Sequence, residues 1–211
     1  NRFRKGGLDA ARAGDTTVLE ALLTHGWCAS MARDKRGASA LHYAAGHGHV
    51  DCCAMLCAAG LEVDDRTVDG ATPLHWAVAG VTSRRPSTHV TGTHSVDRAT
   101  TTLPPDTASR RGEPNGFGTG GHLETATWLV GRGANVGAVT VDGNSILHWC
   151  AWAGQLELLE WLTDHIRTQQ LREKTGLSAS DESDPLSVHS LNRKGCSAAH
   201  WAASGGGLAV C

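Results

Sequence analysis

The sequence predicts an all-α solenoid, in which short helix-turn-helix units with tight turns at their tips stack side by side. Three observations predict this fold. A glycine followed five residues later by a histidine recurs four times, with small or aromatic residues after it. A second motif, Gly-x-Val/Leu-Asp/Glu, follows three of these copies. Hydrophobic residues make up 40% of the 211-residue chain, which is enough for a packed core.

The spacing of the four motif histidines gives the period of the repeat. His42 and His75 are 33 residues apart, His75 and His148 are 73 apart, and His148 and His200 are 52 apart. Subtracting a unit of 33 residues leaves insertions of 40 and 19 residues. Several copies in one phase indicate a repeat array rather than a chance match.

Each copy carries the residues that begin a helix after a tight turn. A glycine in the turn accommodates a positive φ, and Asp-Gly is a favoured turn pair. These turn glycines are Gly37, Gly70, Gly143 and Gly195. Two residues later stand the expected N-caps, Ser39, Thr72, Ser145 and Ser197. Pro73 suits the first helical position, because its missing N–H has no helical partner there.

The second motif begins a second helix in each unit. Val50, Cys53 and Leu56 lie at helical spacing, and Gly60 then suits the left-handed end of that helix. The preceding segment 8–26 fits the helical half of a unit but lacks the turn and the Leu-His pair. We therefore expect it to cap the N-terminal end of the stack.

These motifs resemble the ankyrin repeat, whose signature is a glycine turn, then Thr-Pro-Leu-His, then a pair of alanines. The second unit carries Thr72-Pro73-Leu74-His75 in full, whereas the other units replace parts of it. The resemblance covers roughly residues 8–81, 121–166 and 192–211. A single unit of this type cannot bury both of its faces, so neighbouring units are expected to stack.

The resemblance implies one ankyrin-repeat domain over residues 1–211. Its expected parts are an N-terminal capping repeat at 8–32, a first repeat at 33–66, a second at 67–139 with a flexible insert at 82–121, a third at 140–191 with an extended helix and an acidic Ser-rich loop at 167–190, and a truncated fourth at 192–211. The insert is expected to loop out between the two helices of the second unit. Because the fourth unit stops within its second helix, we expect the native chain to continue.

The family resemblance also implies a binding surface, made of the turn tips and the exposed face of the first helices. The corresponding tips here are Lys35-Arg36, Val68-Asp69, Val141-Asp142 and Arg193-Lys194. The helix face adds Gly46-His47, Ala79, Trp152 and Ser204, and Arg66 borders the first groove. Since the outer tips are basic and the middle tips acidic, we predict a protein partner with a mixed, partly acidic contact surface. For Trp152, packing and partner contact both remain open.

Composition and motifs exclude several other functions. The formal net charge of −2 argues against a general nucleic-acid binder, which needs a basic excess. The longest apolar run, 52–61, is shorter than the roughly 20 residues that a membrane span needs. No nucleophile elbow, phosphate loop or His-Glu-x-x-His motif is present. We predict a monomeric intracellular module, cytoplasmic or nuclear, without catalysis or cofactor.

The 12 histidines and seven cysteines raise the question of a metal site. Structural zinc needs four ligands at close spacing, such as Cys-x-x-Cys pairs, and the sequence has none. We therefore predict no metal. The motif histidines have a structural interpretation instead, since each ring can hydrogen-bond the turn backbone and tie successive units together. The aromatic residues after them, Tyr43, Trp76, Trp149 and Trp201, are expected to pack within the stack.

The remaining cysteines and histidines leave two alternatives open. Cys52, Cys53 and Cys57 lie along one helix and are expected to pack as reduced thiols. His47 and His49 flank a turn glycine and are expected to face solvent. The alternatives to a binding scaffold are a metal or redox sensor that uses these side chains, and a regulatory or targeting module of a larger enzyme or channel.

Overall fold

The computed structural model describes residues 2–80, 122–173, 187 and 189–205. Within these ranges the regular secondary structure is helical, apart from two isolated β-bridges, which confirms the predicted all-α fold. The expected insert at 82–121 and the last residues of the fourth repeat lie outside the described residues. The α-helices are α1 (Arg2–Ala13), α2 (Thr16–Thr24), α3 (Ala40–Gly46), α4 (Val50–Ala58), α5 (Pro73–Ala79), α6 (Leu123–Gly131), α7 (Ile146–Ala153), α8 (Leu156–Glu173) and α9 (Ala198–Gly205), and a short 3-10 helix spans Ala29–Met31.

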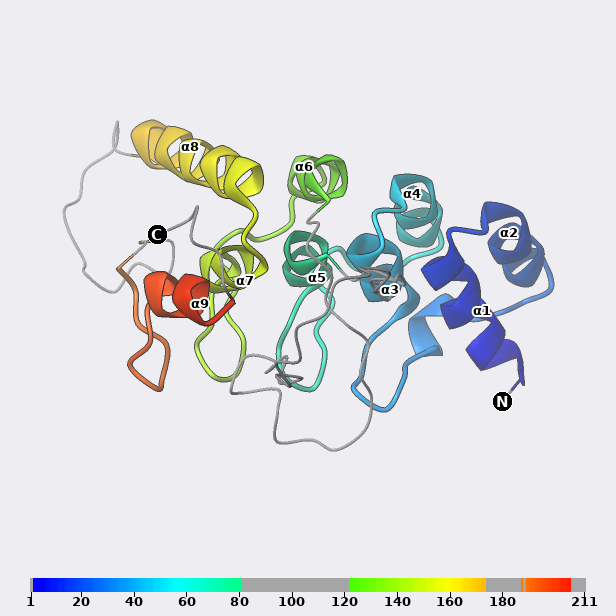
Figure 1. The fold of residues 1–211 in the computed structure, drawn as a ribbon. Coiled ribbons are helices and arrows are strands. Elements are labelled where there is room, and N and C mark those ends of the chain that lie inside the picture. Colours follow the sequence, from blue (N-terminus) through cyan, green and yellow to red (C-terminus); the bar gives the residue numbers. More distant parts are fainter. Residues whose placement is uncertain (1, 81–121, 174–186, 188, 206–211) are drawn as a thin grey trace, which may run out of the picture.

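The helices form two layers (Figure 1). One layer holds α1, α3, α5, α7 and α9, and each of these helices packs against the next one along the row. The other layer holds α2, α4, α6 and α8, each packed on its partner in the first layer. Helices α1 and α9 lie at opposite ends of the row, and the turns between units project from the first layer away from the second (Figure 1).

The core lies between the two layers and repeats with the sequence. The same position of the first helix is filled by Leu41, Leu74 and Leu147, all at most 1% exposed. The facing position of the second helix is filled by Leu56, Leu129 and Leu162, all 0% exposed. Burying one such side chain stabilises the fold by about 1.5–3 kcal/mol. These leucines are shared between the helices of a unit, so neither helix of a pair is stable alone.

Helix α1 begins at Arg2, earlier than the expected start of the capping segment at Leu8. Gly6 and Gly7 disfavour a helix on local propensity, which is why the sequence pattern starts later. Packing requires a glycine at position 7, because a Cβ on Gly7 would overlap the indole of Trp27. Trp27 is 8% exposed, so its packing against α1 outweighs the weak propensity of the glycine pair.

The turns between units are joined to one another by backbone hydrogen bonds. The N–H of Val68 donates to the carbonyl of Arg36, and the N–H of Val141 donates to the carbonyl of Asp69, both at 2.9 Å. The N–H of Arg193 donates in the same way to Asp142, also at 2.9 Å. Each turn is therefore held by its neighbour as well as by its own bonds.

Gly70 shows why the turn position needs glycine. Its φ is +78°, and a Cβ built on it would lie 3.1 Å from the backbone nitrogen of Val141. That nitrogen belongs to the hydrogen bond with Asp69, so a larger residue would both strain the turn and push against the next one.

Replacing Gly70 by Ala is expected to lower the free energy of unfolding by about 1–3 kcal/mol. The loss combines the cost of a left-handed conformation for a residue with a Cβ and the tight contact with the next turn. Urea denaturation followed by circular dichroism measures it.

Gly131 provides the matched control. It lies within α6, and a Cβ built on it meets no atom within 4 Å. Gly131→Ala is therefore expected to leave stability unchanged or to raise it by up to about 1 kcal/mol. Equal losses for the two variants would contradict the account of the turn.

Candidate functional site

The side chains at the turn tips form one surface, called here the tip row. It consists of Lys35-Arg36, Val68-Asp69, Val141-Asp142 and Arg193-Lys194. The backbone bonds between turns bring these predicted contact residues together in order along one edge of the stack. Val68 and Val141 are 57% and 54% exposed, so two tips present apolar surface to solvent. The family resemblance places both valines in the contact surface as tip residues, which stays a prediction.

The motif histidines bond the start of each first helix, next to the tip row. In all four units the N-cap hydroxyl lies 2.9 Å from Nδ1 of the histidine three residues later. The other ring nitrogen reaches the following unit, since Nε2 of His42 lies 3.1 Å from the Ala71 carbonyl oxygen. Nε2 of His148 lies 3.0 Å from the Cys196 carbonyl oxygen in the same way. Each of these two rings therefore joins two successive units.

The hydrogen bonds of His42 fix its protonation state. The backbone N–H of Ser39 points at Nδ1, 3.2 Å away. An N–H can only donate, so Nδ1 accepts and the single ring proton sits on Nε2, where it donates to Ala71. A second proton would be buried and would face a donor. Burial lowers the pKa of His42 to about 4 and that of His75 to about 3, and it lowers the pKa of His148 as well.

Each buried motif histidine also packs edge-on against an aromatic residue of the following unit. The pairs are His42–Trp76, His75–Trp149 and His148–Trp201, with ring centroids 5.6, 5.7 and 5.8 Å apart. The three indoles are 3–5% exposed, so they pack within the stack. Arg36 lies over Trp76, with its guanidinium carbon 5.6 Å from the ring centroid. This contact links the tip row to the helices of the first layer, called here the inner helices.

His47 and Trp152 lie at the far end of the first helices from the tips. His47 is the C-cap of α3, and Trp152 is the last residue but one of α7. Both side chains are half-buried, and Ser204 near the same end of α9 is exposed. A helix of eight residues is about 12 Å long, so these residues lie on a different part of the surface from the tip row.

Two expectations for this end of the helices are wrong. Gly46 and Ala79 are buried, because neighbouring first helices pack closely there. His47 and His49 face solvent only in part, since both are half-buried and their rings stack with centroids 6.2 Å apart. Nε2 of His49 also lies 3.3 Å from the Arg12 carbonyl oxygen of the preceding unit. Burial, with nearby Arg12, lowers the pKa of His47 to about 4.

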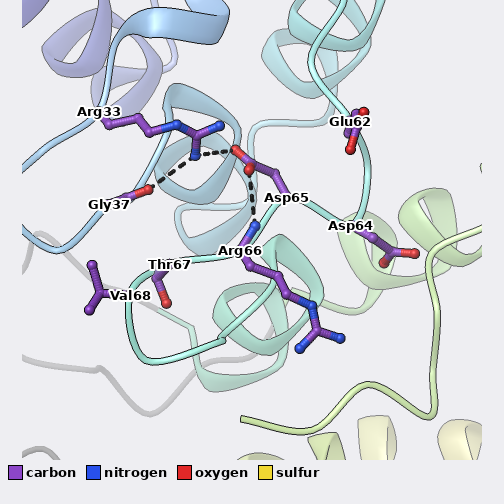
Figure 2. A pocket seen from close by; sticks show the side chains of 8 residues that line it. All are labelled: Arg33, Gly37, Glu62, Asp64, Asp65, Arg66, Thr67 and Val68. Atoms are coloured by element: carbon purple, nitrogen blue, oxygen red, sulfur yellow. Dashed lines mark hydrogen bonds and ion pairs between the residues drawn. The ribbon is translucent and has the colours of Figure 1, made fainter. Parts of the chain in front are cut away.

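Arg66 lines an open cavity of about 460 Å³ beside the first two tips (Figure 2). The lining is mostly charged and consists of Arg33, Gly37, Glu62, Asp64, Asp65, Arg66, Thr67 and Val68. Arg33 donates to Asp65 at 2.8 Å and to the Gly37 carbonyl at 3.2 Å. Arg66 points away from this pair (Figure 2) and donates to the carbonyl of Val139 at 3.1 Å. The predicted contact residue Arg66 therefore also ties two successive loops.

The six cysteines in the described ranges are free thiols. On α4, Cys52 and Cys53 are 0% exposed and Cys57 is half-buried, and burial raises the pKa of all three. Burial also raises the pKa of Cys150 to about 12. A thiol that stays protonated is a poor metal ligand and a slow nucleophile. Within the described part of the chain, no three His, Cys, Asp or Glu side chains are grouped so that they could hold a metal ion.

Comparison with protein families agrees with this architecture. A model of ankyrin repeats in three copies matches residues 8–83, and a model of ankyrin repeats in many copies matches residues 118–163. The chain therefore belongs to the ankyrin-repeat family, whose repeats are in general protein–protein interaction modules and typically non-catalytic. A search of curated proteins gave no match. None of the described helices is long and apolar enough to cross a membrane.

Acidification is expected to destabilise the stack below about pH 6.5. Because the pKa values of His42 and His75 are lowered from 6.5 in the folded chain, the unfolded chain takes up protons first as the pH falls. As the pH falls, each ring then lowers the free energy of unfolding by up to about 1.4 kcal/mol per pH unit, until the pH reaches the ring's pKa in the folded chain. Above pH 6.5 the stabilisation contributed by His42 and His75 is fully present. Urea denaturation at about pH 7.5, 6.5 and 5.5 measures the slope.

The variant His42→Gln tests the assignment of this slope. It lowers stability at every pH, but it also removes one titrating ring, so the change in stability between about pH 6.5 and 5.5 should shrink by that ring's share. A slope identical to that of the wild-type chain would show that His42 is not protonated on unfolding in this range.

Proposed function

We propose that this chain binds a protein partner across its tip row and inner helices, and that it performs no catalysis. The observation that supports this most directly is the rigid array of exposed tips. Three backbone hydrogen bonds of 2.9 Å join the four tips, while valine, lysine and arginine side chains project from them into solvent. A surface that is already ordered loses little conformational entropy on binding, which favours affinity.

Arg36 and Trp152 are the proposed anchors at the two ends of the inner helices. Arg36 is held over Trp76 and is half-buried beside the tips. Trp152 is half-buried near the end of α7, where an indole can add apolar contact area. Arginine and tryptophan are the residue types in which binding energy concentrates at protein interfaces.

The alternative functions receive less support from the described residues. A metal or redox sensor needs ionised thiols, whereas burial keeps those of Cys52, Cys53 and Cys57 protonated. Free thiols in the described ranges support an intracellular site of action, in the cytoplasm or the nucleus. A regulatory or targeting module of a larger enzyme or channel would use the same surface to hold its partner.

Replacing Arg36 and Trp152 together by Ala is expected to weaken binding at least tenfold. The loss of two contacts of this type corresponds to about 1.4 kcal/mol or more. The partner is first isolated by affinity capture with the wild-type chain, and its Kd for each purified variant is then measured by calorimetry. Circular dichroism should show unchanged helix content.

The double variant Arg132→Ala with Trp161→Ala is the matched control. Arg132 lies over Trp128 with its guanidinium carbon 4.9 Å from the ring centroid, as Arg36 lies over Trp76, and Trp161 is half-buried in α8. Both control residues lie in the second layer of helices, so less than a twofold change in Kd is expected. Similar losses for both double variants, or no loss for Arg36 and Trp152, would place the contact elsewhere.

A further inference from the structure

The tip row has a pattern of charge and hydrophobicity that is symmetric about its centre. At the first position of the tips the residues run Lys35, Val68, Val141 and Arg193, which is cation, apolar, apolar and cation. At the second position they run Arg36, Asp69, Asp142 and Lys194, which is cation, anion, anion and cation. The backbone bonds between successive turns keep these positions in register, so the pattern is displayed as one fixed surface.

The two central valines expose apolar surface between the charged residues of the tip row. Val68 and Val141 are more than half exposed and occupy the same position in adjacent units. Single exposed apolar residues are normal on a protein surface, but apolar groups gathered on one surface are typical of binding sites. Val68 also stands at the rim of the charged cavity (Figure 2). Covering both side chains would remove their apolar surface from water, which favours binding.

The charges around the valines are available to a partner. Lys35, Asp69, Asp142 and Arg193 form no ion pair with another described residue, and the ion pair found in the described ranges joins Arg33 to Asp65 instead. The outer cations attract acidic groups, whereas Asp69 and Asp142 repel acidic groups and attract basic ones at the centre. Such an alternation fixes the register of a bound segment and suppresses partners of uniform charge.

We infer that the segment of the protein partner that contacts the tip row has two apolar side chains at its centre, a basic side chain beside them and acidic residues at both ends. This inference rests on the proposed function and specifies the partner's chemistry. The apolar pair covers Val68 and Val141, the basic residue meets Asp69 or Asp142, and the acidic ends meet Lys35 and Arg193. A uniformly acidic segment would be repelled at the centre, and a uniformly basic one at the ends.

The test is a selection of random peptides displayed on phage against the whole wild-type chain. The enriched sequences should share an acidic, apolar, apolar, acidic order with Lys or Arg between the acidic ends. The Kd of the best synthetic peptide, measured by fluorescence anisotropy, should rise at least tenfold for Val68→Asp with Val141→Asp. With Lys35→Glu and Arg193→Glu, the selection should instead enrich peptides with basic ends.

The control uses exposed apolar residues away from the tip row. Val18 on α2 is 43% exposed and Met31 in the 3-10 helix is 73% exposed. Val18→Asp with Met31→Asp should change the Kd of the selected peptide less than twofold, and circular dichroism checks that all variants keep their helix content.

Three results would overturn the inference: a selection that yields no binder, enriched peptides without the apolar pair or the acidic ends, or a Kd unchanged by the aspartates at Val68 and Val141. The variant with Arg36 and Trp152 replaced by Ala separates this inference from the proposed function. If that variant loses the captured partner while the valine variant keeps it, the proposed function stands and the tip-row pattern does not specify the partner. If neither variant loses the partner, both proposals fail.

Discussion

His42 and His148 each bond two successive units at once, and the stack depends on this arrangement. The Nδ1 atom of His42 accepts from the N-cap of its own helix, while Nε2 lies 3.1 Å from the carbonyl of Ala71 in the next unit. The ring is 0% exposed and packs edge-on against Trp76, so neither bond competes with water. Such a ring makes both of its hydrogen bonds only when both units are folded. It therefore couples units that are otherwise separate helix pairs, and it sets the position from which the turns project.

Much of this architecture could be predicted from the sequence, because its determinants are local and recur in phase. A turn glycine, an N-cap hydroxyl and a histidine three residues later define the start of each first helix, and the spacing of the copies revealed the repeat. The start of α1 could not be predicted in this way. Gly6 and Gly7 look unfavourable for a helix until the indole of Trp27 is seen to need the space at Gly7. The burial of His47 and His49 was missed for a similar reason, since it arises from the stacking of turns that are distant in sequence.

The candidate surface shows the same division between local and long-range determinants. The order of the tips follows from the repeat, so the row of Lys35, Asp69, Asp142 and Arg193 could be predicted from the sequence. The exposure of Val68 and the contact between Arg36 and Trp76 depend on how adjacent units pack, and no single unit encodes them. The scaffold is general to the family, whereas specificity must reside in these side chains. In the proposed function, the tips therefore select the partner, and the inner helices support the tips and add the contact of Trp152.

The most direct test of the account is nuclear magnetic resonance of the His42 imidazole nitrogens. At neutral pH the ring is expected to carry its proton on Nε2 and to exchange that proton slowly with water. It should stay neutral until the pH approaches about 4. A ring protonated on Nδ1, or one that titrates near the ordinary histidine value of about 6.5, would show that His42 does not join the two units.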